Sequence, residues 1–257
     1  MDLGLGGKTA LVLGSTSGLG LAVARALSSE GARVALTGRR GDEAERLAAE
    51  LPGAVGLQCD LTQPDSAERL VKETTQALGE IDILILNAGG PPPGRADELD
   101  SPAVRAAIDT LLIRQLEFVS LVLPTMKATG WGRIVGLGSS GVQQPLANLA
   151  LSNLSRAGLA GYLKTLASEV AVDGVTVNMV LPGRIATDRV ASLDRGKAER
   201  ESLDIATVQE RSRATIPAGR YGLPDEFGAV VAFVCSAQAS YVTGEQIRCD
   251  GGLVSAF

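Results

Sequence analysis

Short apolar runs alternate along this chain with longer segments in which apolar residues recur at helical spacing. Several of the short runs are apolar at successive positions, as in Ile81–Leu86, where Asp82 is the one polar residue. Strands covered by helices on both faces show such runs, whereas half-exposed strands alternate apolar and polar residues. We predict strands at Thr9–Leu13, Arg33–Thr37, Ala54–Cys59, Ile81–Leu86, Arg133–Leu137, Thr176–Val180 and Gln246–Arg248.

Segments of helical period fill the intervals between these runs, and three of them end at Gly31, Gly79 or Gly174. Glycine commonly follows the last turn of a helix. Alternating strands and helices predict an α/β fold with a doubly wound parallel sheet of seven strands and helices on both faces. No linker or repeat interrupts the alternation, so residues 1–257 are expected to form one domain. The clearest predicted helices are Leu19–Glu30, Pro64–Leu78, Val104–Lys127 and Asn153–Val172.

One charged stretch, Arg184–Pro217, departs from this rhythm. Its pattern predicts one or two helices outside the sheet. Two interpretations stay open: a mobile substrate flap over residues 184–217, or a solvated helical pair with no role in binding.

The composition agrees with a packed domain, because 45% of the 257 residues are hydrophobic and 21% are charged. The formal net charge is −5, so we expect no nucleic-acid partner. The chain contains no histidine, which excludes Ser-His-Asp catalysis and histidine-bound zinc.

Three cysteines, Cys59, Cys235 and Cys249, lie far apart and show no CxxC spacing. They are too few for a disulfide framework or a cysteine-rich metal site, so we expect buried thiols in a reducing compartment and no bound metal. Residues 1–8 hold no basic segment followed by an apolar stretch, and no later apolar run approaches the roughly 18 residues that span a bilayer. The sequence predicts a cytoplasmic protein without a membrane partner.

A glycine-rich string directly follows the first predicted strand and opens the first predicted helix. Glycine permits a tight backbone that approaches a phosphate closely, and a helix N-terminus offers unpaired N–H groups with a partial positive charge. This context predicts a turn that binds a dinucleotide pyrophosphate; a turn needed only for packing is the alternative. The string consists of Gly14, Ser15, Thr16, Ser17, Gly18, Leu19 and Gly20.

Four short motifs, taken in order, point to one family. The glycine string has the spacing GxxxGxG, and Asn87–Ala88–Gly89, Pro182–Gly183 and Asp250–Gly251–Gly252 follow the fourth, sixth and last predicted strands. Together they resemble the short-chain dehydrogenase/reductase family over essentially the whole chain, and within it the 3-oxoacyl-acyl-carrier-protein reductases. The resemblance implies a Rossmann-type NAD(P)-binding domain, a small-molecule substrate, and a homo-oligomer, tetramer or dimer, built through the long helices.

The end of the second predicted strand indicates which dinucleotide is preferred. An acidic side chain there would accept hydrogen bonds from a free ribose 2′-hydroxyl and repel a 2′-phosphate. Gly38 stands at that place, followed by Arg39 and Arg40. Guanidinium groups favour a 2′-phosphate through charge-assisted hydrogen bonds. We therefore expect NADP rather than NAD; the alternative is that both arginines merely face solvent.

The resemblance implies further contacts with the cofactor. Asp60 would meet the adenine amino group, Asn87 would support the strand ends, and Thr187 would hold the nicotinamide carboxamide. The predicted cofactor residues outside the glycine string are Arg39, Arg40, Asp60, Leu61, Asn87, Ala88, Gly89, Pro182, Gly183, Ile185 and Thr187.

The catalytic positions depart from the family. Its usual set is Asn, Ser, Tyr and Lys, with the tyrosine thirteen residues after the serine and the lysine four residues further. That spacing places Ser139 at the serine, Ser152 at the tyrosine and Arg156 at the lysine. The preceding helix places Leu111 at the asparagine. Ser139, Ser152 and Arg156 are the predicted catalytic residues, and only Ser139 matches the family.

The missing tyrosine matters because it is the acid that protonates the alkoxide formed in reduction. A serine hydroxyl has a pKa close to that of water, far above the pKa of about 10 of tyrosine, and the difference corresponds to about 8 kcal/mol. Ser152 therefore does not replace that acid. Arg156 stabilises negative charge but does not relay a proton.

Other residues with polar groups are candidates for the missing proton donor. The aromatic residues Tyr162, Tyr221 and Tyr241 are expected to pack in the interior. The loop residues Gln143, Gln144 and Asn148 either bind substrate or an ordered water, or simply form a polar surface loop. Arg114, one turn beyond Leu111, could turn toward the vacated pocket.

Two classes of function follow. In the first, the chain is an NADP-dependent oxidoreductase acting on a carbonyl or hydroxyl group, with a 3-oxoacyl-like substrate and water as the proton source. In the second, it is a dinucleotide-binding sensor or a silent subunit without turnover. Lyase or isomerase chemistry is a third class, but the sequence offers no acid–base pair that supports it. Pro91–Gly94 and Arg184–Pro217 are expected to line the substrate entrance, the former as a rigid rim.

Overall fold

The computed structural model describes residues 1–255. Their seven strands form one sheet in the order β3-β2-β1-β4-β5-β6-β7, and every neighbouring pair is parallel. This confirms the predicted α/β fold. The order reverses between β1 and β4, so a crevice opens there at the carboxyl ends of the strands. The strands are β1 Thr9–Val12, β2 Arg33–Gly38, β3 Val55–Gln58, β4 Ile83–Leu86, β5 Gly132–Leu137, β6 Val175–Pro182 and β7 Gln246–Cys249.

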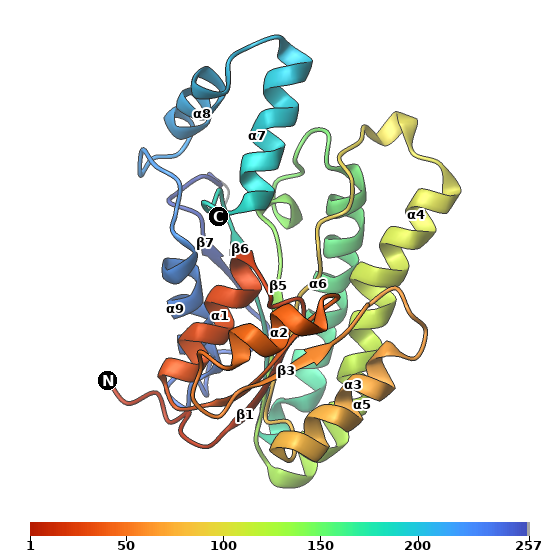
Figure 1. The fold of residues 1–257 in the computed structure, drawn as a ribbon, viewed down its shortest axis with the longest axis vertical. Coiled ribbons are helices and arrows are strands. Elements are labelled where there is room, and N and C mark those ends of the chain that lie inside the picture. The colour runs from red at the N-terminus through yellow and green to blue at the C-terminus, as the bar shows by residue number, and fades with distance from the viewer. Residues whose placement is uncertain (256–257) are drawn as a thin grey trace.

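Helices cover both faces of the sheet (Figure 1). One face carries α1 Gly18–Ser29, α2 Gly41–Ala48 and α9 Pro224–Cys235; the other carries α3 Ser66–Leu78, α5 Arg114–Thr129 and α6 Ala150–Val170. The backbones of α1 and α9 approach closely, since a Cβ on Gly228 would lie 2.7 Å from the carbonyl oxygen of Ala22. Glycine at this position therefore sets the distance between the two helices.

Strand β4 explains why the run Ile81–Leu86 is apolar at successive positions. Leu84 and Leu86 pack with the helices α3, α5 and α6, whereas Ile83 and Ile85 pack with α1 and α9. All four side chains are essentially inaccessible to water. Both faces of the strand are thus buried, as the run predicted.

The long helix expected at Val104–Lys127 is not uniform. It consists of α4 Ser101–Ile108, a π-helical segment Asp109–Ile113, and α5, which ends at the left-handed Gly130. The π-helical segment contains Leu111, which is buried. Such segments are rare and frequently lie at functional sites.

Two helices stand outside the sheet, as the charged stretch predicted. They are α7 Asp188–Glu201 and α8 Ile205–Ala214, seen at the top of Figure 1 above the carboxyl ends of the strands. A partly buried ion pair joins Arg184, which follows β6, to the inaccessible Asp194 of α7. Asp194 also accepts a hydrogen bond of 2.9 Å from the hydroxyl of Tyr221. This cluster connects the middle of α7 to Arg184 and Tyr221.

The cysteines are free thiols, of which Cys59 and Cys235 are buried and Cys249 is half-buried. Burial raises the pKa of Cys235 to about 12. Within residues 1–255, no helix combines the length and the apolar character that a membrane crossing requires.

Candidate active site

The glycine string forms a tight turn between β1 and α1. Gly14 and Gly18 both have φ of 55°, in the left-handed region that favours glycine. A Cβ on Gly20 would lie 2.4 Å from the carbonyl oxygen of Gly14, so that no side chain fits there. Within the described chain, Ser17 makes no side-chain capping bond to α1. The first amides of α1 are therefore available to an anion.

Neighbouring side chains hold this turn in shape. The Asn87 amide donates to the carbonyl oxygens of Leu13 and Gly14, at 3.1 and 3.0 Å. Thr37 accepts from the Gly14 amide at 3.1 Å, and its own amide donates to the Ser15 hydroxyl at 2.8 Å. Sequence reasoning missed Thr37, although a threonine at the end of β2 beside the turn was a usable signal. Ser15 itself supports the turn from within.

A cavity of about 650 Å³ extends from the glycine turn across the ends of β4, β5 and β6 to the helices α7 and α8. It brings together most of the predicted cofactor residues and all three predicted catalytic residues. The predicted residues that line it are Gly14, Ser17, Gly18, Leu19, Gly20, Asn87, Ala88, Gly89, Ser139, Ser152, Arg156, Pro182, Gly183, Ile185 and Thr187.

Other predicted cofactor residues lie outside this cavity. Thr16 packs against Gly38, where a Cβ would come within 2.5 Å of the threonine methyl. Arg39 and Arg40 are exposed after β2. Asp60 accepts hydrogen bonds from the amide and hydroxyl of Thr62, which, with the charge of Arg39, lower its pKa. These residues surround the edge of β2 and β3, beside Leu61.

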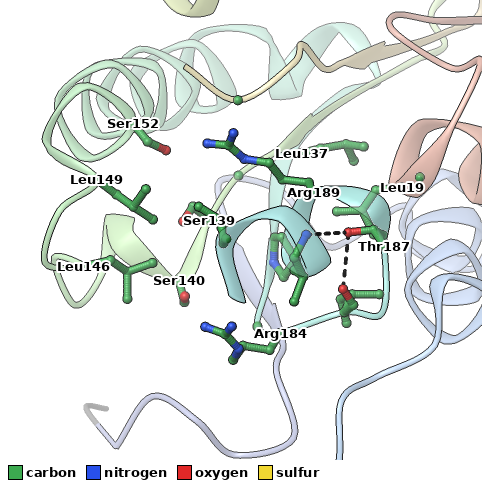
Figure 2. A pocket seen from close by; sticks show the side chains of 18 of the residues that line it. Leu19, Leu137, Ser139, Ser140, Leu146, Leu149, Ser152, Arg184, Thr187 and Arg189 are labelled. Atoms are coloured by element: carbon green, nitrogen blue, oxygen red, sulfur yellow. Dashed lines mark hydrogen bonds between the residues drawn. The ribbon is translucent and has the colours of Figure 1, made fainter. Parts of the chain in front are cut away.

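Ser139 and Ser152 face the cavity together with Arg189 (Figure 2). The Ser139 oxygen accepts a hydrogen bond of 3.0 Å from the Gly141 amide, which leaves the hydroxyl proton free to be donated. Arg156 lies one helical turn after Ser152 on α6 and donates to the carbonyl oxygen of Leu137. Burial, followed by the charge of Arg189, lowers the pKa of Arg156 to about 10. The guanidinium is therefore still charged at pH 7.

No tyrosine lines this cavity in the part of the chain that the structure describes. Tyr162 packs against the core beneath α6, as expected, and burial raises its pKa. Tyr221 contacts Asp194 and Arg184. Tyr241 is fully exposed, so the expectation that it packs in the interior was wrong.

Arg114 points away from the cavity, and the suggestion that it fills the vacated pocket was wrong. Its guanidinium donates to the carbonyl oxygens of Leu61 and Pro64 and pairs with Glu117. These carbonyl acceptors lie on the loop after β3, so the Arg114 side chain is bound there and not in the cavity.

The loop between Ser139 and Ser152 contributes apolar rather than polar groups to the cavity. Gln143 donates to the Gln246 side chain at 3.3 Å, and Gln144 is exposed. Asn148 adopts a left-handed turn conformation with φ of 61°. Leu146 and Leu149 line the cavity in their place, as Figure 2 shows. Of the two interpretations, the polar surface loop is the one that the contacts favour.

A second cavity of about 500 Å³ lies beneath the proline segment. Pro91–Gly94, expected at the substrate entrance, lines this space together with the buried Leu111 and Leu151. Gly89 lines both cavities. The segment also contacts α7, because the Arg189 guanidinium donates to the carbonyl oxygen of Pro91 at 2.6 Å.

The parallel sheet, the crevice at its reversal of strand order and the glycine turn define a Rossmann-type dinucleotide-binding fold. Comparison with known proteins then gives the family. Residues 14–254 match a family model described as enoyl-(acyl carrier protein) reductase. The chain is 36% identical over 265 residues to the 3-oxoacyl-[acyl-carrier-protein] reductase FabG of Aquifex aeolicus, covering 98% of this chain and 100% of that protein. The protein belongs to the short-chain dehydrogenase/reductase family.

Solved structures agree with this assignment. L-sorbose reductase from Gluconobacter frateurii, complexed with NADPH and L-sorbose, superposes with a TM-score of 0.93 at 28% identity, covering all of both chains. An actinorhodin polyketide ketoreductase variant with NADPH gives 0.91 at 33% identity, covering 96% of this chain and 97% of that one. The family is one of oxidoreductases that use nicotinamide dinucleotides.

Proposed function

We propose that this protein is an NADP-dependent oxidoreductase that acts on a carbonyl or hydroxyl group of a small, 3-oxoacyl-like molecule. The observation that carries the proposal is one cavity that joins the glycine turn to Ser139, Ser152 and Arg156. A cofactor-binding turn beside groups that stabilise an oxyanion is what a reductase requires.

The residues present fit a nicotinamide dinucleotide. The turn at Gly14, Gly18 and Gly20 offers space and unpaired amides for a pyrophosphate. Thr187, the N-cap of α7, lines the same cavity close to the turn, because a Cβ on Gly18 would lie 3.8 Å from its methyl carbon; we propose that it holds the carboxamide. When bound, the nicotinamide would supply the hydride chemistry, which the protein's own groups do not provide.

The protein's contribution to the reaction is charge stabilisation. Ser139 has a hydroxyl proton to donate to the substrate oxygen, and Arg156 has N–H groups beyond the one bonded to Leu137. A permanent cation at that place stabilises the developing negative charge. Because Arg156 does not release its proton at pH 7, we assign the protonation step to water.

The test is direct. The purified protein is mixed with NADPH and a panel of 3-oxoacyl thioesters, diketones and ketoses, and NADPH consumption is recorded. We expect consumption above background with at least one substrate class. No consumption with any of them at high protein concentration would contradict the proposed activity.

The arginines after β2 carry the preference for NADP. Replacing both, as Arg39→Ala with Arg40→Ala, should weaken NADPH binding by at least about a hundredfold, since charge-assisted bonds contribute about 1.5–3 kcal/mol each. NADH binding should stay within about twofold, because it lacks the 2′-phosphate. Isothermal titration calorimetry with both cofactors measures this. An equal loss of affinity for both cofactors, or no loss for either, would show that the two side chains do not bind the 2′-phosphate.

A second candidate function is a dinucleotide-binding protein without turnover, and the absence of tyrosine from the lining of the described cavity favours it. Ser139→Ala separates the two functions. The substitution should lower the turnover of an enzyme while leaving NADPH affinity nearly unchanged. In a sensor neither property changes, because there is no turnover to lose.

We also propose that the chain forms a homo-oligomer through α5 and α6. Leu121 of α5 and Leu154 of α6 are 37% and 47% exposed, and Ile113, next to α5, is 42% exposed. Large apolar side chains at this exposure on neighbouring helices suit a two-fold interface. Sedimentation velocity of the purified protein measures the oligomeric state.

A further inference from the structure

The substrate end of the main cavity is positively charged. Lys197 of α7 and Arg211 of α8 line it, together with Arg156, Arg184 and Arg189. Among the lining residues of the described chain, Asp188 is the single carboxylate. The protein as a whole carries a net charge of −5, so this concentration of cations is a local feature and not the effect of a basic surface.

Most of these charges are not neutralised within the protein. Arg184 pairs with Asp194, and Lys197 lies 4.0 Å from Glu201, at the limit of an ion pair. Within residues 1–255, Arg156, Arg189 and Arg211 have no carboxylate within 4.0 Å. Cations gathered without counter-charges around a cavity attract an anion.

Lys197 and Arg211 belong to α7 and α8, whereas the phosphate sites proposed for the cofactor belong to the glycine turn and to Arg39 and Arg40. Lys197 follows Arg189 by eight residues on α7, which is about 12 Å along a helix axis. Leu193 lies between Arg189 and Lys197 on the same face of α7, and Leu146 and Leu149 also line the cavity. The cavity thus combines apolar side chains with the cations of α7 and α8.

We propose that Lys197 and Arg211 bind a carboxylate of the substrate, at the end remote from the reacting oxygen. The proposal rests on the proposed function and narrows its substrate class to oxo acids, or the corresponding hydroxy acids. Ser212 of the same surface adds a hydroxyl group that can donate to the carboxylate, whereas the Thr215 hydroxyl already donates to the Ser212 carbonyl oxygen at 2.8 Å. Arg211 presents a planar guanidinium, which suits the two oxygens of a carboxylate.

The test uses the protein saturated with NADP⁺ and a homologous series of methyl ketones that end in a carboxylate, each beside its methyl ester. Calorimetry measures the affinity of each pair. The best acid should bind at least about tenfold more tightly than its ester, and added salt should reduce this preference. An inorganic phosphate titration tells whether the site prefers a phosphate instead.

Two double variants test which cations cause the preference for the acid over its methyl ester. Lys197→Gln with Arg211→Gln should remove the acid preference, about tenfold, and leave NADP⁺ affinity unchanged. The matched control is Arg195→Gln with Arg213→Gln, which removes two exposed cations from the same helices that do not line the cavity. It should behave as the wild type, and thermal unfolding checks that each variant folds.

Equal affinity for acids and esters overturns the proposal, as does an acid preference that survives in the first double variant. So does a phosphate that binds more tightly than every acid. If that variant instead loses NADP⁺ affinity, the cations serve the cofactor and the proposal is wrong. Failure of the proposed function has a different signature: no member of the substrate panel consumes NADPH, whether or not the cofactor binds. The comparison of acids with esters still decides the proposal, and it is made on the protein alone if NADP⁺ does not bind.

Discussion

Arg156→Gln is expected to lower kcat by about a hundredfold or more, with little change in NADPH affinity. Removal of one preorganised donor to a developing oxyanion costs about 10²–10³ in rate. Glutamine keeps a neutral donor but loses the positive charge. Steady-state kinetics with the best substrate measures kcat, and calorimetry measures the dissociation constant of NADPH.

The control variant for this prediction is Arg156→Lys, which keeps a cation on the same turn of α6. It should recover part of the lost rate. Because Arg156 also donates to the carbonyl oxygen of Leu137, thermal unfolding of both variants checks the fold. A change in kcat of less than threefold in Arg156→Gln, in a variant that folds normally, would show that another group stabilises the oxyanion.

Gly20→Ala should weaken NADPH binding by at least about a hundredfold. A Cβ there would come within 2.4 Å of the Gly14 carbonyl oxygen and 2.9 Å of the Ser15 Cα, so the turn must open before α1 can start. The amides that would hold the pyrophosphate then lose their common direction. Calorimetric titration with NADPH gives the affinity, and circular dichroism reports the fold.

Gly161→Ala is the matched control, because nothing lies within 4 Å of the added Cβ on α6. It should bind NADPH as the wild type does. Should Gly20→Ala fail to fold, Gly18→Ala takes its place: its Cβ meets no atom closer than 3.8 Å, and only the φ of 55° is strained. NADPH affinity within threefold of the wild type in the folded glycine variants would refute the role of the turn.

Much of the fold was predictable from the sequence because burial on both faces leaves a clear signal. The runs around β1, β4 and β5 are mostly apolar at successive positions, and the structure confirms each to within two residues at either end. The π-helical segment at Asp109–Ile113 was not predicted. It contains neither glycine nor proline, and its apolar spacing continues that of the flanking helices. The change from α-helical to π-helical hydrogen bonding is therefore not visible in the spacing of apolar residues.

The candidate site was predictable where short motifs and the family's residue spacing mark its members. The glycine turn and Asn87 lie at strand ends whose meeting point the topology dictates. Leu146, Lys197 and Arg211 come from three other segments, and only the packing of α7 and α8 over the sheet places them at one cavity. The long side chain of Arg114 was misplaced for a similar reason, since its carbonyl partners belong to a distant loop.

The resulting site has two unlike halves. The turn with Gly14, Gly18 and Gly20 is shaped for a dinucleotide, whereas the groups beyond it are cations and hydroxyls. Such a site would place hydride transfer with the cofactor, stabilisation of the oxyanion with Arg156 and Ser139, and protonation with water. In this account the substrate carboxylate at Lys197 and Arg211 would orient the reacting carbonyl.

NADPH oxidation with the ketone acid series tests this account most directly. The wild-type protein should oxidise NADPH in the presence of at least one acid, faster than with its methyl ester, and Arg156→Gln should lose about a hundredfold of that rate. If the protein binds NADPH by calorimetry yet oxidises none of it with any acid, ester or thioester, it is a dinucleotide-binding protein without turnover, and the account is contradicted.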